Sequence, residues 1–91
     1  MNKFIYTQTD EVLNLGCVVR ITPVEIEAEN TVSGEEVTAY AINALTVNDE
    51  EIQLGIYETE EELFTVMEEI KKWISSNAFS LFIVPVTVTP D

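Results

Sequence analysis

The sequence predicts an α+β domain: an antiparallel β-sheet of about five or six strands, with one α-helix in the C-terminal half packed on one face, and a final β-strand. Three observations lead to this prediction. Short stretches of alternating or β-branched residues, separated by turn residues, run from "KFIYT" to "IQLGIY". The spacing of apolar residues then becomes helical in "TEEELFTVMEEIKKWISSN". Strand-like composition returns in "AFSLFIVPVTVTPD", so the helix lies between two β segments.

The first half of the chain is expected to form an antiparallel meander. "KFIYT" and "VLNLGCVVRI" predict two strands, the second with a bulge at Gly16. "VEIEAE" alternates strictly, which places Glu25, Glu27 and Glu29 on the face in water. "VTAYAINALTV" has apolar residues on both faces and is therefore expected to be a central strand. The turn "NDEE" connects it to "IQLGIY".

The helix is predicted over roughly residues 60–75. Thr59 is the expected N-cap, and Glu62, three residues later, completes a capping box. The apolar stripe comprises Leu63, Val66, Met67, Ile70 and Ile74. Its expected partners on the sheet are Val37, Ala39, Ala41, Ile52 and Leu54, with the facing register open by one residue.

The final strand is marked by a proline. Pro85 lacks the backbone donor that a ladder needs, so this strand is expected to lie at a sheet edge or to break at residue 85. After the helix, Asn77 suits a left-handed cap. The sequence contains no internal repeat or linker.

Size and composition predict a single domain spanning residues 1–91, because a second domain would leave neither half a core. The one cysteine, Cys17, has no partner for an internal disulfide, and its apolar neighbours favour a buried structural residue over a reactive thiol. The longest apolar run, residues 81–86, is far shorter than a membrane span. We therefore expect a cytoplasmic protein.

Charge is the main functional signal. Seventeen acidic residues oppose four basic ones, which gives a formal net charge of −13. Such a field repels nucleic acid and anionic membranes, and it accelerates encounters with basic partners. Direct binding to DNA, RNA or membranes is therefore not expected, whereas a basic protein surface is the expected partner.

Enzyme chemistry has little support. The chain has no histidine, which removes the commonest general base and metal ligand. "NDEE" at 48–51 lacks the glycine of a calcium loop, and "EEE" at 60–62 points in three directions around a helix. The residues before the helix, "YET", are not a phosphate loop. No catalytic, metal-binding or cofactor-binding residue and no cofactor is predicted, although a carboxylate pair in a pocket remains an alternative.

The candidate partner-binding residues are the acids expected to face water, together with one aromatic residue: Glu25, Glu27, Glu29, Glu61, Glu68, Glu69 and Trp73. Trp73 is expected to lie half exposed at the rim of the helical stripe. The leading hypothesis is a non-enzymatic acidic binding protein that occupies a basic, nucleic-acid-binding site on a host protein. The alternative is a small structural protein that forms a homo-oligomer through the C-terminal strand "FSLFIVPVTV", with acidity serving only solubility.

The order of "KFIYT", "VLNLGCVVRI", "LGIYETEEELFTVMEEIKKWI" and "LFIVP" resembles small uncharacterised acidic sheet-plus-helix proteins of Gram-positive bacteria and their phages. The resemblance covers nearly the whole chain and implies a sheet, a glutamate-rich helix and a short closing strand, but no activity. In size, acidity and make-up the chain is also similar to phage inhibitors that mimic DNA, although it shares no motif with them. A phage or mobile-element origin is the expectation that follows.

Overall fold

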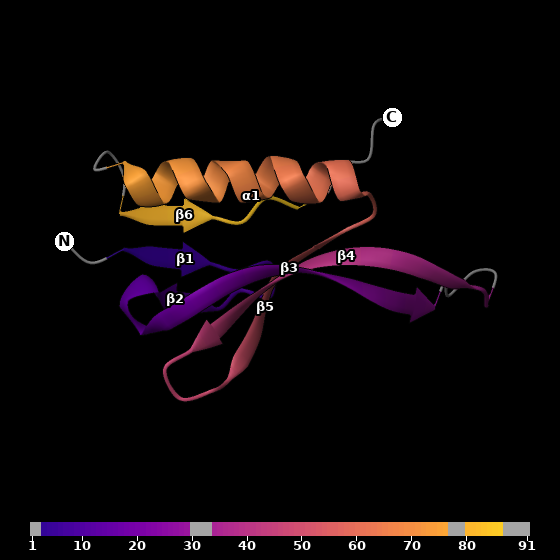
Figure 1. Cartoon of the computed structure of the whole chain (residues 1–91), viewed down its shortest axis with the longest axis horizontal. Helices are drawn as coiled ribbons and strands as arrows, with labels where there is room; N and C mark the ends of the chain where they lie inside the picture. Colours follow the sequence, from indigo (N-terminus) through magenta and orange to yellow (C-terminus); the bar gives the residue numbers. More distant parts are fainter. Residues whose placement is uncertain (1–2, 30–33, 77–79, 87–91) are drawn as a thin grey trace.

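The structure, a computed structural model, describes residues 3–29, 34–76 and 80–86 of the chain. It contains two three-stranded sheets and one helix (Figure 1). The terminal sheet has the order β2-β1-β6, formed by Val12–Asn14, Phe4–Tyr6 and Leu81–Ile83. The long sheet has the order β3-β4-β5, formed by Val18–Glu29, Glu36–Thr46 and Glu51–Tyr57. The α+β class is therefore confirmed, whereas the prediction of one sheet of five or six strands is wrong.

The sheet divides where a bulge had been expected. A 3-10 turn, η1 (Leu15–Cys17), separates β2 from β3. The Asn14 side chain accepts a hydrogen bond from the Gly16 N–H at 2.9 Å, so a local polar contact replaces ladder bonding at this point. The turn redirects the chain from the terminal sheet to the long sheet. Register shifts occur instead between Val18 and Arg20 on β3 and between Ile42 and Asn43 on β4.

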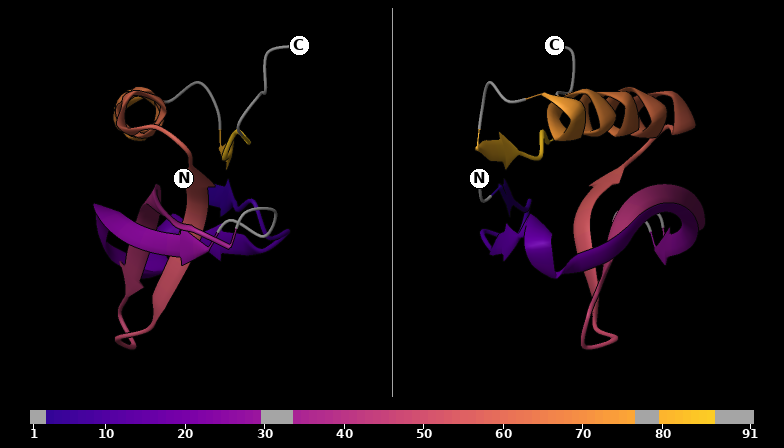
Figure 2. Two further views of the ribbon diagram at one scale, coloured as in Figure 1. Left: turned by 90° about the vertical axis from the view of Figure 1, so that its right-hand side faces the viewer. Right: turned by 60° about the vertical axis from the view of Figure 1, so that its left-hand side comes forward.

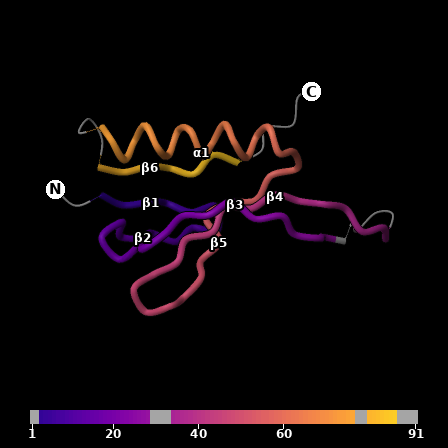
Figure 3. The backbone as a smooth tube through the Cα atoms, viewed as in Figure 1, coloured from indigo at the N-terminus to yellow at the C-terminus, as the bar shows by residue number. Residues whose placement is uncertain are grey.

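The last strand pairs with the first. β6 runs parallel to β1, with Phe4 beside Leu81 and Tyr6 beside Ile83. β6 therefore occupies an edge of the terminal sheet and ends at Ile83, before Pro85, as the proline predicts. Figure 3 shows β6 running between α1 and β1.

The helix α1 (Glu60–Ser75) begins and ends near the predicted residues. The Thr59 side chain accepts from the Glu62 N–H at 3.2 Å, which confirms the N-cap. At the other end, the Ser76 N–H donates to the Trp73 carbonyl at 3.1 Å. The expected cap at Asn77 lies outside the described residues.

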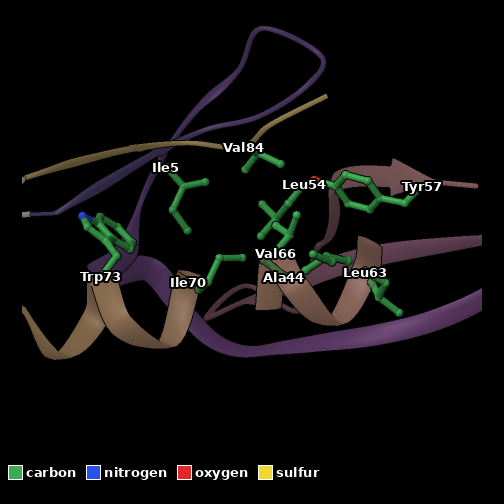
Figure 4. Close-up of a cluster of buried hydrophobic side chains, with 10 residues drawn as sticks. Ile5, Ala44, Leu54, Tyr57, Leu63, Val66, Ile70, Trp73 and Val84 are labelled. Carbon is green, nitrogen blue, oxygen red and sulfur yellow. The ribbon is translucent and has the colours of Figure 1, made fainter. Parts of the chain in front are cut away.

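The core lies between α1 and both sheets, as Figure 4 shows. Its buried members are Ile5, Ile42, Ala44, Leu54, Tyr57, Leu63, Val66, Ile70, Trp73 and Val84. On the helix, Leu63, Val66 and Ile70 are buried as predicted, but Ile74 is 44% exposed. Trp73 takes the place expected of Ile74, because the buried stripe follows the 63-66-70-73 spacing.

The strand β4 presents a different face to the core from the one predicted. Ile42 and Ala44 belong to the core cluster, so strand alternation places Ala39 and Ala41 on the opposite face, where both are buried. The sequence left the facing register of this strand open by one residue, and in the structure the face with Ile42 and Ala44 packs against the helix. Figure 2 shows α1 and β6 together on one side of the long sheet.

Candidate functional site

The first acidic hollow is an open depression beside the N-terminal half of α1, where residues 85–86 pass the helix. Its volume is about 400 Å³. It is lined by Tyr57, Thr59, Glu61, Glu62, Thr65, Val66, Glu69, Pro85 and Val86. The three carboxylates all come from α1 and lie on one flank of it, since Glu62 and Glu69 are separated by two helical turns.

The wall of this hollow opposite α1 is held in place by hydrogen bonds to one carbonyl group. The Tyr57 hydroxyl and the Gln8 side-chain amide both donate to the Pro85 carbonyl at 2.7 Å. One residue earlier, the Val84 N–H donates to the Tyr6 carbonyl at 3.0 Å. The chain after β6 is therefore fixed against β1 and β5.

Tyr57 belongs to the core and also lines the first acidic hollow. Its side chain is buried, and burial raises the pKa of the hydroxyl to about 12. The negative charges of Glu69 and Glu62 also raise this pKa, whereas the hydrogen bond with Gln8 lowers it. The phenol is therefore neutral at physiological pH and serves as a donor to Pro85.

The second acidic hollow lies on the other flank of α1, facing the hairpin of β3 and β4. Its volume is about 250 Å³. It is lined by Pro23, Val24, Glu25, Tyr40, Glu60, Leu63 and Phe64. The Phe64 side chain is 52% exposed, so an aromatic face is available beside two carboxylates.

The predicted acidic residues are distributed over several parts of the surface. Glu61 and Glu69 meet in the first hollow, and Glu25 lines the second. Glu27 is exposed on β3, two residues beyond Glu25 and on the same strand face. Glu68 forms an ion pair with Lys71 at 3.1 Å. The five acids whose side chains the structure describes are therefore divided between the two hollows and other parts of the surface.

The structure describes the backbone of Glu29. Its backbone pairs with Glu36 at the end of β3, and its side chain lies outside the described residues. The sequence reasoning also missed Glu60 and Glu62, which line the hollows. Glu62 had been assigned to the capping box, and the first turn of a helix is where one residue can serve a cap and a surface together.

The expectation that Trp73 is half exposed is wrong. Its side chain is 6% exposed and packs on Phe82, with ring centroids 5.5 Å apart. The Lys3 ammonium group lies 5.3 Å from the centroid of the Trp73 ring. Because β6 and the N-terminal residues cover the C-terminal half of α1, this indole is part of the core.

The three lysines lie away from the carboxylates at the start of α1. Lys71 and Lys72 lie ten residues or more after Glu61, which is about 15 Å along a helix. That distance exceeds a Debye length of about 8 Å at physiological salt, so these lysines do not neutralise the first turn. Lys3 lies beside Trp73 at the same end of α1. The N-terminal half of α1 is therefore the acidic end of the helix.

No protein-family model, no curated protein sequence and no solved structure matches the chain. Among residues 3–29, 34–76 and 80–86, no group of three or more metal-ligating side chains is placed to hold an ion. In the same residues, no helix is both long and apolar enough to cross a membrane. The structure thus defines a small α+β protein with two three-stranded sheets, one helix and two acidic hollows.

Proposed function

We propose that this protein is a non-enzymatic binding protein that uses the acidic flank of α1 formed by Glu61, Glu62 and Glu69 to occupy a basic site on another protein. The observation that carries the proposal is the convergence of Glu61, Glu62 and Glu69 in one hollow of about 400 Å³. A hollow of this kind suits a lysine or arginine side chain, because the long aliphatic stem can lie on Val66 and Val86 while the charged end meets carboxylates.

The helix dipole opposes this field but does not cancel it. The N-terminus of a helix carries about half a positive elementary charge. Glu60, Glu61 and Glu62 in the first turn carry three negative charges, so the first turn remains negative. The dipole instead stabilises the carboxylates where they are. The proposed contact is therefore with cations.

The second hollow adds a contact of a different kind. Phe64 exposes an aromatic face next to Glu25 and Glu60, and an arginine guanidinium can stack on such a face while bonding a carboxylate. A ridge of α1 with a hollow on each flank suits a partner with several basic side chains. A nucleic-acid-binding groove is a surface of this type, and we propose that a phage or mobile-element inhibitor of a host protein would use it this way.

The test uses a labelled oligolysine peptide as the probe and two variants matched in charge. The hollow variant carries Glu61→Gln, Glu62→Gln and Glu69→Gln; the glutamine at 62 retains a capping box. The control variant carries Glu11→Gln, Asp49→Asn and Glu50→Gln, three exposed acids in the turns of the hairpins. Each variant removes three negative charges from the same total.

Fluorescence anisotropy at several salt concentrations is the measurement. We expect the hollow variant to bind the peptide about 10-fold more weakly than the control variant, a difference of about 1.4 kcal/mol. Binding of the wild type should weaken as salt rises, because the contact is electrostatic. Equal losses in the two variants would refute the proposal and leave the acids a role in solubility alone.

A competition assay tests the nucleic-acid part of the proposal. Labelled duplex DNA is first bound to the oligolysine peptide, and the protein is then added. If the acidic end of α1 substitutes for phosphates, the wild type releases the DNA at lower concentration than the hollow variant does. Release at the same concentration by both would count against mimicry at this site.

A further inference from the structure

The edge strand β6 has backbone groups directed away from its sheet. β6 has one neighbour, β1, in the terminal sheet. The Phe4 N–H donates to the Ser80 carbonyl and the Val84 N–H to the Tyr6 carbonyl, so residues 80 and 84 direct their groups toward β1. Alternation along a strand then directs the N–H and carbonyl groups of Leu81 and Ile83 to the open edge.

The side chains at this edge are apolar and exposed. Phe82 faces α1 and packs on Trp73, so alternation places Leu81 and Ile83 on the outer face of the terminal sheet. Leu81 is 46% exposed and Ile83 is 64% exposed. On that face they lie beside their β1 partners, Phe4 and Tyr6. We call these four residues the outer apolar face.

β6 is short, with three residues, and Pro85 follows it, and both features limit pairing at an edge. Residues 81–83 themselves carry no lysine, proline or bulge that would block a short pairing. Residues 80–86 also carry no charge at all. In a chain of net charge −13, this makes the edge of β6 a part of the surface that a second copy can approach with little repulsion.

The groove between α1 and β6 has a rim that complements itself. Trp73, Phe82 and Ile83 line the groove, and Glu69 and Lys72 lie at its helical side. A twofold axis brings the same surface of both copies together, so an interface of this type needs a surface that fits itself. A rim with one carboxylate and one ammonium group meets this condition. A basic peptide would instead meet Lys72 there, which favours a second copy as the occupant.

We propose that two copies of this chain pair through β6, antiparallel across a twofold axis at Phe82. Leu81 then faces Ile83 of the second copy as a hydrogen-bonded pair, and the two terminal sheets become one six-stranded sheet. The outer apolar face continues from one copy to the other. This inference does not require the proposed function: Glu69 lines both the first hollow and this groove, but residues 81–83, which make the pairing, line neither acidic hollow.

The oligomeric state of the wild type and of two matched variants is the first test. Ile83→Lys places a charge at the edge, and Val19→Lys makes the same change on β3 at a residue that is also 64% exposed. Sedimentation equilibrium of the wild type is expected to give twice the 10.2 kDa chain mass. Ile83→Lys should raise the dimer dissociation constant about 100-fold or more, and Val19→Lys should leave it nearly unchanged.

A monomeric wild type at about millimolar concentration would overturn the proposal, because a dimer weaker than that is not a stable interface. A dimer lost in Val19→Lys but retained in Ile83→Lys would also overturn it. Circular dichroism of Ile83→Lys should match that of the wild type, since the side chain is exposed. The same variant should still bind the oligolysine probe, which separates this proposal from the acidic hollows.

Cross-linking tests the register in a Cys17→Ser background. Hydrogen-bonded antiparallel partners have Cα atoms about 5.5 Å apart, within disulfide range. The double variant Leu81→Cys/Ile83→Cys should therefore form disulfide-linked dimers on mild oxidation. Either single variant should not, because identical residues would lie about 8 Å apart across this axis. Equal cross-linking by all three variants would refute the register.

Discussion

Replacing Lys3 by methionine is expected to destabilise the fold through the C-terminal end of α1. The Lys3 ammonium group donates to the carbonyls of Trp73 at 2.7 Å and Ile74 at 2.9 Å, and also to the carbonyl of Ser76. It lies 5.3 Å from the centroid of the Trp73 ring as well. One side chain thus satisfies several of the carbonyls that a helix leaves unbonded at its end.

The expected loss is about 2 kcal/mol. A hydrogen bond that water can partly replace contributes about 0.5 kcal/mol, the low end of the range, and this site is only partly buried. A cation over an aromatic ring at a site that water can reach adds about 0.5 kcal/mol, and a cation at a helix C-terminus adds a similar amount. Methionine keeps most of the aliphatic stem, so the substitution removes mainly the charge and its bonds.

Urea unfolding followed by circular dichroism is the measurement. For a small domain with a slope of about 1 kcal/mol per molar urea, the midpoint should fall by about 2 M. Lys72→Met is the control, because Lys72 lies in the last turn of the same helix but is exposed. It should lower the free energy of unfolding by less than about 0.5 kcal/mol. Equal effects of the two substitutions would show that general charge near the helix end, and not the contacts of Lys3, provides the stabilisation.

Three further predictions concern the helix cap, a closely packed glycine and a buried phenol. Thr59→Ala should lower the free energy of unfolding by about 1 kcal/mol, because it removes the acceptor for the Glu62 N–H; a thermal melt would show this, and no change would contradict the cap. Gly55→Ala should lower the free energy of unfolding by about 1–3 kcal/mol, because the new Cβ would lie 2.9 Å from Val84 Cγ1. Urea unfolding measures this loss, and an unchanged free energy would mean that Val84 can move. The pKa of Tyr57 is raised from 10.0 to about 12 in the folded protein, so folding favours the protonated phenol and its stabilisation is lost as pH rises from 10 toward 12. Urea midpoints across this range should therefore fall more steeply for the wild type than for Tyr57→Phe, and parallel curves would argue against the raised pKa.

The helix was predictable because its signals are local. Thr59 and Glu62 lie within one turn of each other, and the apolar spacing reports which side of the helix is buried. The error at the C-terminal end, where Trp73 replaces Ile74 in the core, has a distant cause. Phe82 on β6 and Lys3, which precedes β1, both contact Trp73, and no pattern within the helix indicates either contact.

The division into two sheets depends on pairings between residues far apart in sequence. β1 and β6 each read as a strand, but nothing in either segment indicates that they pair in parallel. The turn at Leu15–Cys17 was read as a bulge, because a glycine within a strand-like segment is typical of both. The β3 strand runs continuously from Val18 to Glu29, whereas the sequence predicted a break before "VEIEAE". The strand-forming segments were therefore predictable, but their boundaries and partners were not.

The sequence predicted that the binding site is acidic, but only partly which acidic residues lie together. The sequence identifies the acids on α1 and on β3, but their grouping depends on which flank of the helix each sheet covers. Glu61 and Glu69 share a hollow because the chain after β6 passes that flank. Glu68 pairs with Lys71 instead. The position of residues 85–86 could not be derived from local patterns.

The parallel pairing of β1 with β6 has a consequence for biosynthesis. Phe4 and Leu81 are neighbours in space, although most of the chain lies between them. A ribosome releases β1 long before β6 exists, so Ile5 cannot be fully enclosed until β6 has been synthesised. High sequence separation between paired strands also slows folding. The nascent chain therefore exposes an apolar N-terminal segment during synthesis, which is the interval in which chaperones or unwanted association would act on it.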